Sequence, residues 1–222
     1  MISAIILAGG KGKRMGQDIS KQFIELNHKP VLYYTLKKFI NNKNINNIIL
    51  VVSKDDYDYC KNEVLKKYDL KVNKIVLGGK ERQDSVYNGI QSLEETEIVL
   101  IHDGARPFIS DKIINDGIKF AKEFGAAAPG VMPKDTIKIK DDNNFSVNTP
   151  NRKDLVSIQT PQIFRYEVIK ECHEIIKENG DIVTDDTMVV EKFGHKVYLY
   201  DGEYTNIKIT TPEDLILAEK LV

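Results

Sequence analysis

The sequence predicts an α/β protein with a Rossmann-like three-layer fold, a mostly parallel twisted sheet and a projecting β-hairpin arm. Short apolar runs alternate with segments in which apolar residues recur at helical spacing. Such runs are typical of strands buried on both faces, and their alternation with helices favours a parallel sheet covered on both sides. At residues 133–155 this alternation breaks down, which indicates a different kind of element.

The predicted elements follow one another from the N-terminus to the C-terminus. Strands are expected at residues 2–7, 45–52, 72–77, 98–101, 126–132 and 196–200. Helices are expected at residues 31–39, 55–68, 82–93, after Ser110, after Phe164, at 185–193 and from Thr211 onward. Ser110 is predicted to cap its helix, whose buried face would carry Ile113, Ile114, Ile118, Ala121 and Phe124.

The interruption at residues 133–155 is predicted to be a hairpin. Residues 136–140 alternate apolar and polar side chains, and residues 141–144 have the composition of a turn. Residues 145–147 would then form the second strand of the hairpin. The pattern shows no second-domain boundary, so we expect one domain over residues 1–222 with this arm attached.

Composition restricts the class of protein. The chain has 222 residues, a net charge of -1 and 41% apolar residues, so nothing in it indicates a nucleic-acid partner or a membrane. Its two cysteines have no metal-binding spacing, and no apolar run approaches the length of a membrane span. We therefore expect a cytoplasmic protein with idle thiols.

A glycine-rich loop follows the first predicted strand and carries Lys11, Lys13 and Arg14, with Lys21 soon after. A Rossmann fingerprint fails because its third glycine comes one residue late, and a P-loop fails because Arg14 stands where Ser or Thr is required. From local sequence alone, this loop is equally compatible with a solvated basic turn and with a cradle for phosphate groups.

Several further segments carry a resemblance to a known family. With its Lys21-Gln22-Phe23 the loop is similar to that of sugar-nucleotide pyrophosphorylases. The other segments resemble, in order and approximate spacing, the family of cytidylyltransferases that act on 2-C-methyl-D-erythritol 4-phosphate. They are residues 79–86, 102–107, 135–138, 159–162, 184–186 and 206–210.

The resemblance implies a single nucleotidyltransferase domain that transfers CMP from CTP to this sugar phosphate, releases pyrophosphate and uses Mg²⁺, in non-mevalonate isoprenoid synthesis. It implies catalytic roles for Arg14, Lys21 and Lys208, and CTP contacts by Ala8, Gly9, Gly10, Gly79, Ser85 and Asp103, with Asp103 near the metal. It implies contacts to the sugar phosphate by Arg106, Thr136, Arg152 and Thr184. It also implies a homodimer in which the hairpin arm, with Arg152, reaches the partner's site. Where this family often has Pro, the chain has Ser20, so we expect a less rigid approach to Lys21.

The proposed chemistry is consistent with the residues present. A phosphomonoester has a second pKa of about 6, so it is already an ionised nucleophile at neutral pH and needs no general base. The reaction instead requires cations that offset the repulsion between two anions. Asp103 follows a predicted strand, at the sheet edge where ligands of open α/β sheets bind.

Alternatives remain open at this point. His102 is expected to be a packing or hydrogen-bonding residue. Asp103 alone could cap a turn, Lys208 could lie on a solvated strand face, Thr184 could be only a helix N-cap, and Arg152 could be a surface arginine. The rival functions are ribitol-5-phosphate cytidylyltransferase and a non-catalytic nucleotide-binding protein on the same fold.

Overall fold

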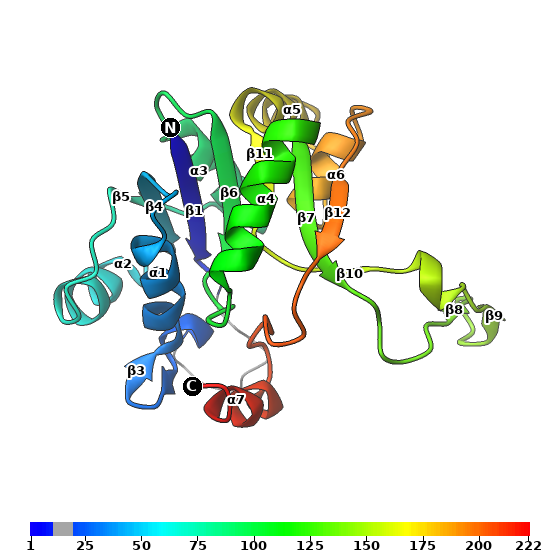
Figure 1. Ribbon diagram of the computed structural model, residues 1–222, viewed down its shortest axis with the longest axis horizontal. Coiled ribbons are helices and arrows are strands. Elements are labelled where there is room, and N and C mark those ends of the chain that lie inside the picture. The colour runs from blue at the N-terminus through cyan, green and yellow to red at the C-terminus, as the bar shows by residue number, and fades with distance from the viewer. Residues whose placement is uncertain (11–19) are drawn as a thin grey trace.

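The structure, a computed structural model, describes residues 1–10 and 20–222. Its centre is a sheet with the strand order β10–β7–β11–β6–β1–β4–β5, with β12 also paired to β7 (Figure 1). These strands are β1 (Ile2–Ala8), β4 (Asn47–Val52), β5 (Lys74–Leu77), β6 (Ile98–Asp103), β7 (Ala126–Val131), β10 (Ser157–Ile158), β11 (Gln162–Arg165) and β12 (Tyr198–Asp201). The predicted α/β fold with a mostly parallel sheet is confirmed.

One central strand was not predicted from the sequence. β11 lies between β6 and β7 and pairs antiparallel with both, while β1 pairs parallel with β4 and β6. Its four residues are too few to show a clear periodicity. A second short antiparallel strand, β10, pairs with the end of β7.

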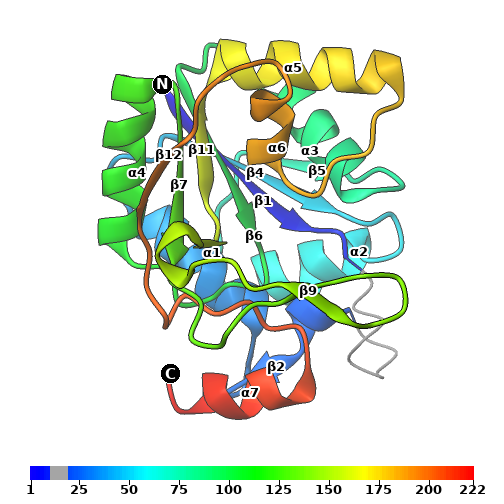
Figure 2. The same ribbon diagram turned by 90° about the vertical axis from the view of Figure 1, so that its right-hand side faces the viewer.

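Alternate residues of the strands supply the cores on the two faces of the sheet. Ala4 and Ile6 pack with α1 (Val31–Asn41), with the π-helix Cys60–Lys66 that follows α2 (Tyr57–Tyr59), and with α4 (Asp111–Phe124). Ile5 packs on the other face with α3 (Arg82–Gln91), α5 (Tyr166–Asn179) and α6 (Asp186–Glu191). Figure 2 shows these helices on opposite sides of the strands. This is the three-layer arrangement expected for strands buried on both faces.

The helix ends follow the predicted capping chemistry, with one error in the buried face. The Ser110 side chain accepts a hydrogen bond from the Ile113 N–H, and α7 (Pro212–Glu219) begins with a capping box formed by Thr211 and Asp214. The prediction that Phe124 is buried is wrong, because it is the last residue of α4 and stacks on Tyr198 of β12 at the surface, with ring centroids 4.5 Å apart.

The predicted hairpin is present and projects away from the sheet (Figure 1). It consists of β8 (Ile139–Lys140) and β9 (Ser146–Asn148), which pair with each other, and is followed by the short 3₁₀ helix Arg152–Asp154. Its first strand is shorter than the predicted 136–140, and its second has the predicted length but begins one residue later than the predicted 145–147. Phe145 and Val147 are 72% and 61% exposed, so the arm has no core of its own.

Smaller elements complete the fold near the C-terminal helix. A short ribbon of β2 (Glu25–Leu26) and β3 (Lys29–Pro30) follows the 3₁₀ turn Lys21–Phe23.

Cys60 and Cys172 are free and buried, as expected of idle thiols. Among the described residues, none of the helices has the length and apolar character needed to cross a membrane.

Candidate active site

A cavity of about 550 Å³ opens at the carboxyl ends of β1 and β6. This is the sheet edge where ligands of open α/β sheets are expected. The residues that line it come from the ends of strands, from the N-terminus of α3 and from the segment before α7. They are Leu7, Gly9, Gly10, Lys21, Gln22, Ser53, Gly79, Lys80, Glu81, Arg82, Ser85, Asp103, Ala105 and Lys208.

Asp103 is the electrostatic centre of this cavity. Lys208 Nζ lies 2.7 Å from its Oδ2, Arg106 Nε lies 3.8 Å from the same oxygen, and Arg82 Nε lies 3.7 Å from Oδ1. The Asp103 N–H donates to Thr160 Oγ1. Although burial opposes ionisation, Lys208, Arg82 and Arg106 hold the pKa of Asp103 well below its ordinary value. The alternative in which Asp103 serves only as a turn cap therefore does not account for its contacts.

Lys208 reaches this carboxylate from a segment without regular secondary structure. The next residue, Ile209, is buried and donates its N–H to Ala105 O at 2.9 Å, which fixes the segment against the loop after β6. Ile209 therefore points inward while Lys208 extends into the cavity. The alternative of a solvated strand face is wrong for Lys208, because its ammonium group is paired with a buried carboxylate.

Two of the residues predicted to bind CTP, Gly79 and Ser85, line the cavity at the start of α3. The Gly79 N–H donates to Ser85 Oγ at 3.1 Å, and α3 begins with a capping box between Glu81 and Asp84. A side chain at position 79 would collide with Asp84 Cβ, so this close turn requires glycine. The structure thus places Gly79 and Ser85 together, with backbone and hydroxyl groups facing the same cavity as Gly9 and Gly10.

The loop that follows β1 is described only in part. Ala8 is buried at the end of β1, and its carbonyl accepts a hydrogen bond of 2.6 Å from Gln22 Nε2. Lys21, one residue earlier than Gln22, lines the cavity. Arg14 lies outside the described residues.

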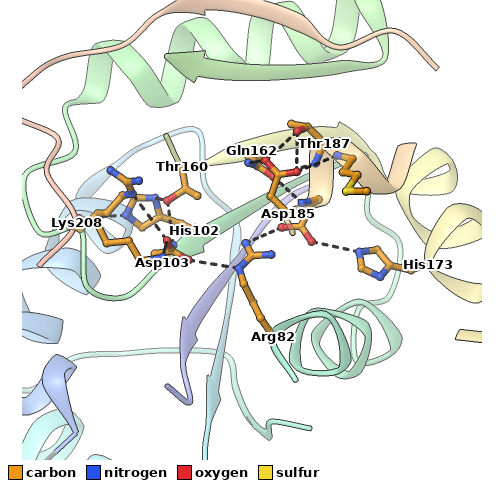
Figure 3. A network of polar contacts seen from close by, with 12 residues as sticks. Arg82, His102, Asp103, Thr160, Gln162, His173, Asp185, Thr187 and Lys208 are labelled. Atoms are coloured by element: carbon orange, nitrogen blue, oxygen red, sulfur yellow. Dashed lines mark hydrogen bonds and ion pairs between the residues drawn. The ribbon is translucent and has the colours of Figure 1, made fainter. Parts of the chain in front are cut away.

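Arg82 was missed as a site residue when the roles were assigned from sequence. It lines the cavity beside Asp103 and pairs through Nη2 with Asp186 Oδ2 at 2.7 Å. Asp186 is buried and also contacts His173 Nε2 at 3.3 Å. Figure 3 shows the guanidinium group of Arg82 between Asp103 on one side and His173 on the other. Although its own burial opposes ionisation, the Arg82 charge keeps the pKa of Asp186 below its ordinary value. The sequence feature that could have indicated Arg82 was its position at the start of a helix, directly after the glycine turn.

The four residues predicted to bind the sugar phosphate lie in three different places. Arg106 lies beside Asp103 and donates through Nη1 to Asn206 O at 2.7 Å. Thr136 and Arg152 lie on the arm, where Arg152 Nη2 donates to Thr136 Oγ1 at 3.3 Å. Thr184 is exposed before α6, and Thr184, Thr136 and Arg152 are not among the residues that line the cavity within the described part of this chain.

The alternative role of Thr184 as an N-cap is wrong by one position. The N-cap of α6 is Asp185, whose side chain accepts a hydrogen bond from the Met188 N–H. Asp185 also accepts one from Gln162 Nε2 at 2.8 Å, which ties the start of α6 to β11. Thr184 lies one residue before this cap, and its hydroxyl donates to Met188 Sδ in the first turn of the helix, at 3.5 Å.

His102 has the packing role expected of it. It is fully buried, its Nδ1 lies 3.1 Å from Thr160 Oγ1, and its Nε2 lies 3.2 Å from Arg106 O. Burial lowers the pKa of His102 to about 4. A neutral imidazole therefore supports the chain on both sides of Asp103 without facing the cavity.

The fold and the site together define an enzyme of the nucleotidyltransferase class, with cations grouped around one carboxylate at the edge of an α/β sheet. The family model "IspD: 2-C-methyl-D-erythritol 4-phosphate cytidylyltransferase" matches residues 2–222. The chain belongs to this family.

Individual relatives match this chain over nearly its full length and over nearly the full length of their own chains. A protein of that name from Clostridium beijerinckii is 65% identical over 222 residues, which cover 100% of this chain and 98% of the relative. One from Clostridium botulinum strain Eklund 17B is 62% identical, covering 100% and 99%. A crystal structure of 4-diphosphocytidyl-2C-methyl-D-erythritol synthase from Anaerococcus prevotii superposes with a TM-score of 0.87 at 40% identity, covering 99% of this chain and 95% of that one. The Francisella tularensis IspD structure gives 0.84 at 30% identity, covering 100% and 99%.

Proposed function

We propose that this chain transfers CMP from CTP to 2-C-methyl-D-erythritol 4-phosphate and releases pyrophosphate, in the cavity around Asp103, as a step of non-mevalonate isoprenoid synthesis. The observation that supports this site best is the convergence of Arg82, Arg106 and Lys208 on one buried carboxylate. These three cations contact two carboxylates, Asp103 and Asp186, so a net positive charge remains and this end of the cavity favours an anionic ligand.

The reaction needs little from the protein besides position and charge. An oxygen of the sugar phosphate attacks the α-phosphorus of CTP, a new P–O bond forms, and the bond to the leaving pyrophosphate breaks. Negative charge accumulates on the reacting phosphoryl group and on the leaving group, so fixed cations lower the barrier. We assign this role to Lys208, to Lys21 and, from the family resemblance, to Arg14.

Binding of CTP is assigned to the part of the cavity between the end of β1 and the start of α3. The backbone N–H groups of Gly9 and Gly10, at the end of β1, suit phosphate oxygens, because glycines allow close approach. Gly79 and Ser85 are assigned to the cytosine and ribose, since their polar groups lie together at the start of α3. Asp103 is assigned to the ribose side of the same nucleotide.

Mg²⁺ fits the donor set if the nucleotide supplies most of its ligands. The described residues contain no cluster of three or more His, Cys, Asp or Glu side chains able to hold a metal ion. Mg²⁺ at nucleotide sites is usually held by one or two carboxylates together with phosphate oxygens and water. Asp103 is the carboxylate that would hold it here. When bound, the ion would neutralise phosphate charge; Lys208 and Arg82 meanwhile keep Asp103 ionised and in place.

The sugar phosphate is assigned to Arg106, Thr184 and, from a second copy of the chain, Thr136 and Arg152. The arm displays Ile137, Ile139, Phe145 and Val147 without a core beneath them. Exposed apolar side chains on an isolated hairpin favour association with another surface. We propose a homodimer through this arm, at residues 133–155.

We also propose that the enzyme is cytoplasmic, since Cys60 and Cys172 are unpaired, as is usual for thiols in a reducing compartment.

Pyrophosphate release tests this function against its nearest rival. The enzyme is supplied with CTP, Mg²⁺ and either 2-C-methyl-D-erythritol 4-phosphate or ribitol 5-phosphate. Faster release with the first substrate is expected. Faster release with the second would move the assignment to a ribitol-5-phosphate cytidylyltransferase. CTP binding without release from either substrate would favour the third reading, a non-catalytic nucleotide-binding protein.

A further inference from the structure

Three side chains, of which Ser53 lines the cavity, form one hydrogen-bonded group, which we call the Asp56 clamp: Ser20, Ser53 and Asp56. Ser20 Oγ donates to Asp56 Oδ2 at 2.9 Å, and Ser53 Oγ donates to the same oxygen at 2.7 Å. The Asp56 N–H donates back to Ser53 Oγ at 3.1 Å. The clamp therefore joins the segment before Lys21 to the segment after β4, two parts of the chain that are far apart in sequence.

Ser20 opens the short turn that carries Lys21. Its carbonyl accepts a hydrogen bond of 2.8 Å from the Phe23 N–H, which closes the 3₁₀ turn Lys21–Phe23. The far side of this turn is fixed by Gln22, which donates to Ala8 O, and by the buried Phe23 ring, which packs edge-on against Tyr59. The near side is fixed by the clamp. Lys21 thus stands between two anchors.

Ser53 lies on the neighbouring wall of the same cavity. It follows β4, lines the cavity with Gly9 and Lys21, and its backbone N lies 3.5 Å from where a Cβ on Gly9 would be. By holding both Ser20 and Ser53, the Asp56 carboxylate therefore fixes the position of the turn Lys21–Phe23 relative to the segment beside Gly9.

The backbone at Ser20 explains why such a restraint is useful. Its φ is -59°, the value that a proline ring would enforce covalently. A serine has no ring to hold φ at this value, so another contact of the chain must restrain its backbone. A hydrogen bond to an ionised carboxylate is stronger than one between neutral groups, so Asp56 can supply it. The sequence predicted a less rigid segment before Lys21, because Ser20 stands where the family often has Pro. The hydrogen bond to Asp56 offsets this loss of rigidity.

We propose that Asp56 is a positioning residue, which places Lys21 for the reaction by holding Ser20 and Ser53. Asp56 itself is not among the residues that line the cavity in the described part of the chain, so it acts through the two serines. The inference rests on the proposed function, because it assigns Lys21 to the transferred phosphate. Small displacements of a positioning group are costly to the chemical step, and less so to ground-state binding.

The test is a double-mutant cycle with Ser20→Ala, Asp56→Ala and the double variant. Each single variant is expected to lower kcat on the order of tenfold, with the KM for CTP changed less than about threefold. Because both remove the same contact, the double variant should be within about threefold of Asp56→Ala. Asp56→Asn retains an oxygen acceptor but loses the charge, so its turnover should lie between those of Asp56→Ala and wild type. Asp58→Ala, at an exposed site on α2, is the matched control and should behave as wild type.

A second measurement separates the clamp from the proposed function. Hydrogen exchange of the Phe23 amide, whose acceptor is Ser20 O, should be faster in Ser20→Ala and Asp56→Ala than in wild type and Asp58→Ala. Multiplicative losses in the cycle, unchanged turnover in Asp56→Ala, or unchanged exchange at Phe23 would each overturn the inference. A wild-type enzyme that releases no pyrophosphate would instead overturn the proposed function, while the exchange measurement would still report on the clamp.

Discussion

The cavity and the arm are built in opposite ways. Asp103 ends a strand of six buried residues and is supported from behind by a buried His102 and by Thr160. Arg152, in contrast, stands on an extension whose apolar side chains face outward, and its side chain donates a hydrogen bond to another arm residue, Thr136. The comparison shows that one chain is sufficient to shape the cavity that we assign to CTP. The residues assigned to the second substrate are divided between this body and the arm.

The energetic difference between the two regions has a simple origin. Strands of the central sheet are covered by helices on both faces, so their backbone and side chains are removed from water together (Figure 2). A two-stranded hairpin without a covered face is marginal in water by itself. We therefore expect the arm to gain order from a second copy of the chain, whereas the cavity should keep its shape without one.

The largest expected effect comes from the cavity. Lys21→Ala should lower kcat on the order of 10²–10³, comparable with the loss of one donor that stabilises transition-state charge. Steady-state pyrophosphate release measures it, and Lys37→Ala at an exposed site on α1 serves as the control. Unchanged turnover in Lys21→Ala would remove this residue from the mechanism and weaken the assignment of the cavity.

A smaller and more selective effect is expected from the arm. Arg152→Ala should raise the KM for 2-C-methyl-D-erythritol 4-phosphate on the order of tenfold, as expected for loss of a charged hydrogen bond, and change the KM for CTP much less. The neighbouring Lys153→Ala variant, also exposed, is the matched control. An equal rise in both KM values would contradict the division of the substrates between cavity and arm.

The smallest effect concerns the support behind the cavity. Burial lowers the pKa of His102 to about 4, so between pH 4 and its unfolded pKa of about 6.5 the unfolded chain binds the additional proton. The stability contributed by neutral His102 is therefore present at neutral pH and is lost as pH falls through this window. The free energy of unfolding should decrease by about 2 kcal/mol from pH 7 to pH 4.5 through this group.

Denaturant titrations at several pH values measure that decrease. His102→Gln should flatten the profile, because glutamine cannot take up a proton in this range. The exposed His195→Gln variant should keep the wild-type slope. A slope that is identical in all three proteins would show that His102 does not control acid stability.

Much of this comparison could be predicted from sequence, because it depends on local patterns. Apolar runs and helical spacing indicated the sheet, its helices and the hairpin. The same pattern placed Asp103 at a strand end, but its role in the site came from the family resemblance. Other features depend on long-range contacts that have no local pattern. β11 is four residues long and antiparallel, and its place between β6 and β7 could not be inferred from its composition.

The same distinction applies to the site. Lys208 lies in an irregular segment, and its pairing with Asp103 arises because Ile209 is buried beside Ala105. Arg82 and Asp186 meet across more than a hundred residues, and Ser20 and Asp56 meet across 36. These contacts required the folded chain. The family resemblance, rather than local pattern, pointed to Thr136 and Arg152, which the structure brings together on the arm.

Mixing two separately inactivated proteins tests most directly the central claim that the cavity of one copy is completed by the arm of another. Lys208→Ala disables the cavity and retains a normal arm, while Arg152→Ala retains the cavity and disables the arm. In a two-fold dimer formed at random from equal amounts, half of the dimers are mixed and each has one intact site. Activity measured at low sugar phosphate after the subunits exchange should therefore recover to about a quarter of wild type. Activity that stays at the average of the two separate variants would show that the arm serves its own chain, and would contradict the account.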